Sequence, residues 1–241
     1  MKPAKASKSK IASSDKIIVF DSGPIISLTT NNLLFILEPL KKKFRGRFCI
    51  TEEVKNELVT KPLTIKKFEF EALQVMRLIE EGTLEVVNAE DTLKLMAITN
   101  SSFTCKNHPM RLTQIGEIST IKYAIDNNAQ TVVIDERTTR LMVEDPESLL
   151  RVLRKKLNCN VQTDNKRIND LSELTKNLKV IRSSELVAAA YALRIMDKFK
   201  TNKIANSSER LIDGTLWGVK LNGCSITEEE ITEISEIVNG K

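Results

Sequence analysis

Acidic side chains follow two apolar runs that are far apart in this sequence. Asp21 comes directly after the run at residues 16–20, and Asp135 and Glu136 follow the run at 131–134. Short apolar runs rich in β-branched residues are typical of buried strands. Open α/β sheets place their chemistry at the carboxyl ends of the strands. The pattern therefore predicts that these acids share one edge of a sheet.

Two further acids lie on helices that we expect to open toward the same edge. Glu57, one turn after Glu53, belongs to the helix expected after the second strand. Glu117 stands in the first turn of the helix expected over 111–128, beside Gly116, which lets another backbone approach closely. Taken alone, Glu53 and Glu57 are equally compatible with a solvated helix face. Glu117 alone is also compatible with an acid that favours the positive end of its helix.

Carboxylates that face one another repel strongly, and hard divalent cations such as Mg²⁺ or Mn²⁺ relieve this repulsion. Such a site suits metal-assisted hydrolysis of a phosphodiester. His108 is the only histidine, which argues against a serine triad and against a histidine-rich zinc site. No Gly-rich phosphate loop follows any expected strand, which disfavours a nucleotide-binding protein.

The elements that must position these acids alternate along the chain. Strands are expected at 16–20, 47–50, 84–87, 131–134 and 178–181. Helices are expected at 31–43, 51–58, 64–81, 91–99, 111–128, through 149–157, and at 185–196, 208–221 and 228–238. Residues 100–108 are expected as a polar loop, and 158–177 as a polar excursion. Alternation of this kind predicts a parallel sheet with helices on both faces.

Four stretches resemble the motifs of PIN-domain proteins in their order and spacing. They are VFDSGPIISL (19–28), ITEEVKNEL (50–58), GEISTIKYA (116–124) and TVVIDERTTR (131–140). The ending LIDGTLWGVKLNGCSITEEEITEI (211–234) is similar to that of an archaeal and bacterial subgroup with extra C-terminal helices. The resemblance implies an α/β fold, a three-layer α/β/α sandwich with a central parallel five-stranded sheet. It also implies an Mg²⁺- or Mn²⁺-dependent nuclease that acts mainly on RNA.

Carried over by position, the resemblance assigns roles to the acids. Asp21 and Glu117 would be direct metal ligands, and Glu57 would hold metal or position water. The fourth acid is ambiguous, because two adjacent acids stand where the family commonly has such a pair. Glu136 is the candidate for the fourth site, with Asp135 beside it.

The resemblance and the mild net charge of +5 also suggest contacts with RNA. The residues expected to contribute are Ser22, Arg137, Arg140, Lys42, Arg45 and Arg47. Ser22 matches a small hydroxyl residue near the metal, whereas structural ion pairs are an equal alternative for Arg137 and Arg140. Residues 1–15 are expected as a flexible basic arm, which is either a solvated tail without a role or a source of salt-dependent attraction to phosphates. Residues 16–241 are expected as one PIN-like domain.

The expected function is that of an endoribonuclease in RNA processing or decay, or in a toxin–antitoxin pair. Its partners would be single-stranded RNA, a second copy in a homodimer, and an antitoxin-like protein. The alternative is a weakened PIN-like RNA-binding or scaffold protein. The four cysteines are expected to be reduced thiols in a cytoplasmic protein, and no apolar run is long enough to span a membrane.

Overall fold

The centre of the molecule is a parallel sheet of five short strands in the order β3-β2-β1-β6-β8. The computed structural model describes residues 16–157 and 159–240. The strands are β1 (Ile17–Phe20), β2 (Arg47–Thr51), β3 (Glu85–Val87), β6 (Thr131–Val133) and β8 (Lys179–Ile181). The strand order reverses between β1 and β6, and this switch point is where such sheets place their ligands. All five predicted strands, and their parallel pairing, are confirmed.

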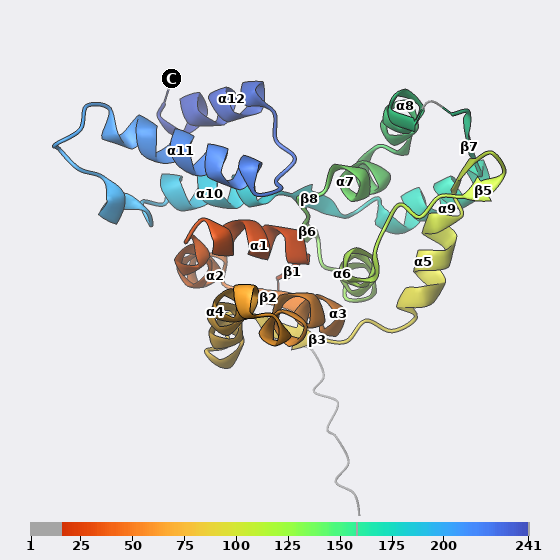
Figure 1. Ribbon diagram of the computed structural model, residues 1–241, viewed down its shortest axis with the longest axis horizontal. Coiled ribbons are helices and arrows are strands. Elements are labelled where there is room, and N and C mark those ends of the chain that lie inside the picture. Colours follow the sequence, from red (N-terminus) through yellow and green to blue (C-terminus); the bar gives the residue numbers. More distant parts are fainter. Residues whose placement is uncertain (1–15, 158, 241) are drawn as a thin grey trace, which may run out of the picture.

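Helices cover both faces of this sheet (Figure 1). One face carries α1 (Ser22–Thr30), α2 (Leu37–Phe44), α4 (Glu69–Glu80), α10 (Ser183–Ala192), α11 (Ser207–Leu221) and α12 (Glu228–Val238). The other carries α5 (Thr92–Asn100), α6 (Ile115–Asp126), α7 (Arg137–Glu144), α8 (Pro146–Leu157) and α9 (Asn165–Thr175). The short α3 (Glu52–Lys55) follows β2. None of the described helices is long and apolar enough to cross a lipid bilayer.

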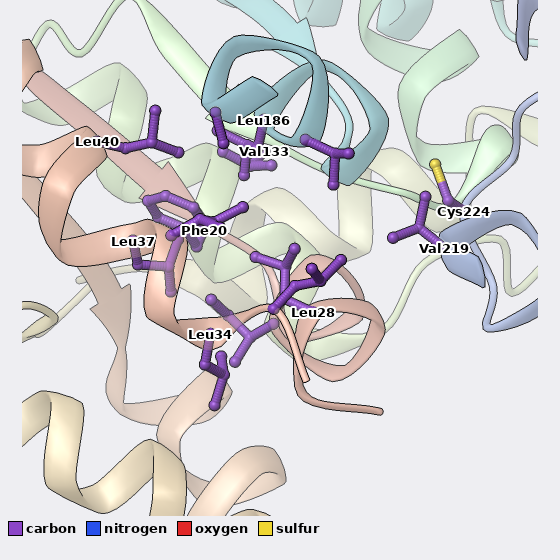
Figure 2. Packing of buried hydrophobic residues seen from close by; sticks show 14 of the residues in the cluster. Phe20, Leu28, Leu34, Leu37, Leu40, Val133, Leu186, Val219 and Cys224 are labelled. Carbon is purple, nitrogen blue, oxygen red and sulfur yellow. The ribbon is translucent and has the colours of Figure 1, made fainter. Parts of the chain in front are cut away.

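Alternation along the strands divides the core in two. Ile18 and Phe20 of β1 face the cluster under α1, α2 and α10, where Phe20 packs beside Leu28, Leu37 and other side chains (Figure 2). Ile17 and Val19 face the cluster under α6 to α9. Because successive side chains of a strand point to opposite faces, a fully apolar strand has to lie between two helical layers. The expected three-layer sandwich is confirmed.

Several predicted helices begin or end in tighter or wider turns. A 3₁₀ turn, Leu34–Ile36, precedes α2, and two more, Pro62–Thr64 and Lys66–Phe68, precede α4. A further 3₁₀ turn, Asp197–Phe199, follows α10. The helix expected over 51–58 consists of α3 and a π turn, Asn56–Thr60. Single π turns often occur at functional sites, and this one contains an acid of the candidate site.

A second, antiparallel sheet corrects the loop expected at 100–108. It consists of β5 (His108–Pro109), β4 (Phe103–Cys105) and β7 (Val161–Thr163). Most of the expected polar excursion at 158–177 forms β7 and α9, of which Val161, Ile168 and Leu171 pack in the core. These strands were not predicted because they are only two or three residues long and because β4 pairs with β7, whose residues are about 60 positions away. The expected arm at 1–15 lies outside the described residues.

The prediction that all four cysteines are reduced was wrong for two of them. Cys105 and Cys159 form a disulfide, with their Cα atoms 6.4 Å apart. The register of β4 with β7 places Cys105 opposite Val161, two residues from Cys159. A sequence separation of 54 gives no sign of that closeness. Cys49 and Cys224 are buried and free, as expected.

The packing of α9 predicts that the segment at 158–177 contributes to stability. Leu171 is 1% exposed in the core, whereas Leu174 on the same helix is 49% exposed. We expect Leu171→Ala to lower the free energy of unfolding by about 2–5 kcal/mol, because it leaves a cavity. We expect Leu174→Ala to change it by less than about 0.5 kcal/mol. Equal effects in urea unfolding would contradict this packing.

Candidate functional site

The candidate site lies where β1 and β6 end, at the switch point of the sheet. Asp21 directly follows β1, and its backbone N–H donates to the carbonyl oxygen of Val133 at 3.0 Å, which ties the two strand ends together. Asp21 is also the N-cap of α1, and its Oδ2 accepts from the N–H of Gly23 at 3.4 Å. The local sequence thus places this carboxylate at the mouth of the sheet.

Asp21 is a buried acid with incomplete compensation. Its side chain is only 4% exposed, and Oδ1 has no hydrogen-bond partner among the described residues. Its pKa is raised to about 7, mainly by burial and then by the charges of Glu117 and Glu57, although hydrogen bonds from the backbone of Ser22 and Gly23 lower it in part. Near neutral pH this carboxyl is therefore close to half-protonated. The groups that contribute most to its pKa include two acids and no positively charged side chain.

Glu57 is held between two helices. It lies in the π turn after α3, and its Oε2 accepts from Ser22 Oγ of α1 at 2.7 Å. On its other side is Gly116 of α6, where an added Cβ would be 2.9 Å from Glu57 Oε1. Any larger residue there would require the Glu57 carboxylate to move. Of the two acids weighed from the sequence, Glu57 and not Glu53 is bonded to the segment after β1.

Glu117 follows Gly116 in the first turn of α6. Its Oε2 accepts from the backbone N–H of Gln114 at 2.8 Å, a bond that fixes the start of the helix. Burial raises its pKa, and the charges of Glu136 and Glu57 raise it further. The mutual effects of Asp21, Glu57, Glu117 and Glu136 indicate that these four acids share one electrostatic environment.

The adjacent acids Asp135 and Glu136 face different surroundings. Asp135 is 2% exposed and satisfied: Oδ2 accepts from Ser27 Oγ at 2.8 Å and Ser183 Oγ at 2.7 Å, and Oδ1 from Ser183 N–H at 2.7 Å. Glu136 caps α7, accepting from the N–H of Thr139 at 2.6 Å, and acts on Glu117. Of this pair, Glu136 acts electrostatically on Glu117, whereas the carboxylate of Asp135 is held by serine donors.

The residues expected to contact RNA lie in two places. Ser22, Arg137 and Arg140 are near the acids: Arg137 is exposed in the first turn of α7, and Arg140 lies 3.7 Å from Glu144. The three that do not join the acids are Lys42, Arg45 and Arg47.

Those three lie in the last turn of α2 and in the segment that leads from it into the amino end of β2, so the parallel sheet separates them from the acids at its carboxyl edge. Arg45 ends α2 and Arg47 begins β2. Lys42 lies 2.5 Å from Glu38, and Arg47 lies 2.7 Å from Glu85. Both cations therefore have acidic partners of their own.

Sequence reasoning missed the donors that hold Asp135. Ser27 and Ser183 are fully buried and come from elements about 110 and 50 residues away. Ser183 is the first residue of α10. Its role has no spacing signal, because the partner is set by which strand ends meet in the sheet.

The donor chemistry of the cluster fits a hard divalent cation. Its four carboxylates offer oxygen atoms, which are the ligands that Mg²⁺ and Mn²⁺ prefer. One of these atoms, Asp21 Oδ1, is buried and has no hydrogen-bond partner among the described residues. Within residues 16–157 and 159–240, however, no three acidic, His or Cys side chains form a ready-made metal cage. One oxygen each of Glu57, Glu117 and Glu136 instead accepts a hydrogen bond, from Ser22 Oγ or from a backbone N–H group.

Comparison with known proteins identifies the part of the chain that carries the acids. A family model described as a PIN domain matches residues 17–146, which is more than half of the chain. No curated protein matches the sequence, and no solved structure does. The matched range contains the four clustered acids and ends before α10.

The raised pKa of Asp21 predicts a pH-dependent stability in metal-free protein. The folded-state pKa of about 7 is above the ordinary value of 3.8. The wild type therefore loses stability as pH rises from about 4 to 7, by at most about 4 kcal/mol at about 1.4 kcal/mol per pKa unit. Asp21→Asn cannot ionise and escapes this loss.

We expect Asp21→Asn to gain stability over the wild type between pH 4 and pH 8 in EDTA, measured by urea unfolding. Asp213→Asn, at an exposed position of α11, is the matched control and should show no such gain. A difference between Asp21→Asn and the wild type that stays constant with pH would contradict the buried, charge-deprived environment.

Proposed function

The chain belongs to the PIN-domain family, and from this premise we propose that it is a metal-dependent endoribonuclease that hydrolyses RNA phosphodiester bonds. PIN domains are generally nucleases. The observation that carries the proposal is the buried Asp21, whose Oδ1 has no partner among the described residues and whose pKa is raised partly by two other acids. A structural carboxylate would be expected to have partners of its own, as Asp135 has.

The residues that would hold Mg²⁺ or Mn²⁺ are Asp21, Glu117 and Glu136, with Glu57 as a further ligand or as the group that positions water. The cation would supply positive charge for the phosphate oxygens and lower the pKa of a water molecule. Asp135 is left out of this set, because its two oxygens already accept three hydrogen bonds.

Hydrogen-bond donors of the protein orient three of the acids, and the fourth acid, Asp21, has to lose a proton. Asp21 must lose its proton to act as a ligand, which its pKa of about 7 permits at neutral pH. Ser22 holds one oxygen of Glu57 and leaves the other to the site. The backbone N–H groups of Gln114 and Thr139 fix one oxygen each of Glu117 and Glu136 in the same way.

Arg137 and Arg140 would contact the phosphates of a single-stranded RNA, since both follow Glu136 on α7. Lys42, Arg45 and Arg47 would then bind only a distant part of the strand. Homodimer formation, an antitoxin-like partner and a cytoplasmic location remain predictions. The Cys105–Cys159 disulfide bears on the last, because disulfides are rare in the cytosol of most organisms.

A second candidate function is that of an RNA-binding or scaffold protein with a weakened metal site. One observation favours it: the carboxylates of Glu57, Glu117 and Glu136 are all engaged by local donors, and no described cluster forms a ready cage. Binding of Mn²⁺ separates the two candidates.

We expect cleavage of a mixed single-stranded RNA that requires Mn²⁺, stops in EDTA, and falls about a hundredfold or more in Glu117→Gln. Even outer-shell partners of a metal contribute about ten- to a hundredfold to affinity or activity, and Glu117 would be a direct ligand. The control Glu80→Gln changes an exposed acid of α4 and should retain full activity. Absence of both Mn²⁺ binding and cleavage in the wild type would favour the scaffold.

Gly116 allows stability and activity to be separated. In Gly116→Ala the new Cβ would press on Glu57 Oε1, so we expect cleavage to fall about tenfold or more, as misplaced site groups cost. The free energy of unfolding should not fall, because alanine favours a helix over glycine by about 1 kcal/mol. The control Gly214→Ala of α11, whose added Cβ meets nothing within 4 Å, should keep full cleavage. Equal cleavage by both variants would show that Glu57 is not needed at this position.

A further inference from the structure

A buried arginine stands at the junction of three elements behind the acids. Arg182 directly follows β8, is 7% exposed, and precedes α10. Its guanidinium donates to Glu185 at 2.6 Å, to the carbonyl oxygen of Ser225 at 2.9 Å and to Glu230 of α12 at 3.0 Å. One side chain thereby connects the sheet, α10 and the segment that enters α12.

Two routes lead from Arg182 to Asp135. The first is through the next residue, Ser183, whose N–H and Oγ both donate to the Asp135 carboxylate at 2.7 Å. The second is through Ser225, whose N–H donates to the Asp135 carbonyl oxygen at 3.1 Å. Ser27 of α1 adds a third donor to the carboxylate. Asp135 is therefore held by its side chain and by its backbone at once.

Asp135 is the residue directly before Glu136, so fixing both ends of Asp135 fixes where the next Cα lies. Glu136 in turn begins α7, and its Oε2 accepts from the N–H of Thr139. We propose that Arg182, Ser225 and Glu230 are positioning residues that hold Glu136 in the site through Asp135. This inference rests on the proposed nuclease function. The three positioning residues lie outside residues 17–146, the range that the family model matches.

Stability alone gives little reason for such a network. Replacing a buried ion pair by apolar residues of similar size is often neutral or stabilising, because desolvation offsets the attraction between the charges. A guanidinium with fixed donor directions does, however, define the relative positions of its acceptors. Here those acceptors belong to α10, to α12 and to the segment between α11 and α12.

The first test measures position without activity. We expect Arg182→Gln to speed hydrogen exchange of the first-turn amides of α7, including Thr139, about tenfold or more in metal-free protein. Arg194→Gln is the matched control, because Arg194 is 82% exposed and pairs with Asp197. Unchanged exchange in a folded Arg182→Gln variant would overturn the proposal.

A milder variant guards against unfolding. Glu230→Gln removes one charged acceptor of Arg182, and Glu233→Gln, at an exposed position of the same helix, is its control. We expect faster exchange in α7 for Glu230→Gln and not for Glu233→Gln. Equal exchange in these two folded variants would likewise overturn the proposal.

The second test uses a double-mutant cycle on RNA cleavage in Mn²⁺. We expect Arg182→Gln to lower kcat about ten- to a hundredfold at a temperature where it is fully folded, with KM for RNA unchanged. In a Glu136→Gln background it should cause no further loss, since it acts through Glu136. Losses that multiply would show that Arg182 acts by another route. A wild type that neither cleaves RNA nor binds Mn²⁺ would overturn the nuclease function alone, while the exchange result would still decide whether Arg182 positions α7.

Discussion

Two buried aspartates follow neighbouring strands of the sheet, and the fold compensates their charges in opposite ways. Asp135 accepts three hydrogen bonds from Ser27 and Ser183. Asp21 keeps one oxygen without a partner among the described residues, and its pKa is raised to about 7. Burying a carboxylate without compensation is costly, so this difference has to be maintained by the surrounding structure. The surrounding elements donate three hydrogen bonds to the carboxylate of Asp135, whereas Asp21 Oδ2 accepts one from the N–H of Gly23.

The donors for Asp135 come from α1, from α10 and from the segment before α12, so C-terminal elements contact the strand end beside the candidate site. The element α1 contributes Ser27, α10 contributes Ser183, and the segment before α12 contributes a backbone N–H from Ser225. Both α1 and α10 lie beside the sheet (Figure 1), and their apolar side chains belong to the core cluster on this face. Their burial and their polar contacts thus serve the same strand end, because the sheet brings β1, β6 and β8 side by side.

The sequence was sufficient for the features that depend on local pattern. Apolar runs at 16–20 and 131–134 predicted strands, and the acids that follow them had to lie at one edge because the sheet is parallel. The sequence could not distinguish the surroundings of Asp135 from those of Glu136, because the Asp135 carboxylate is held by Ser183, about 50 residues away. Nor could it predict the Cys105–Cys159 bond, which results from a pairing of two three-residue strands. Non-local pairing, rather than local propensity, decided each of these features.

The local hydrogen bonds of the remaining acids explain how such a cluster can exist before any cation binds. Ser22, the N–H of Gln114 and the N–H of Thr139 each hold a single oxygen of Glu57, Glu117 or Glu136. Each bond offsets part of the repulsion between the charges and sets the direction of a side chain. None of these three bonds uses the second oxygen of its carboxylate. Acids restrained in this way keep set side-chain directions without a cation, and a cation that used Asp21 as a ligand would have to displace its proton, because the pKa of Asp21 is raised to about 7.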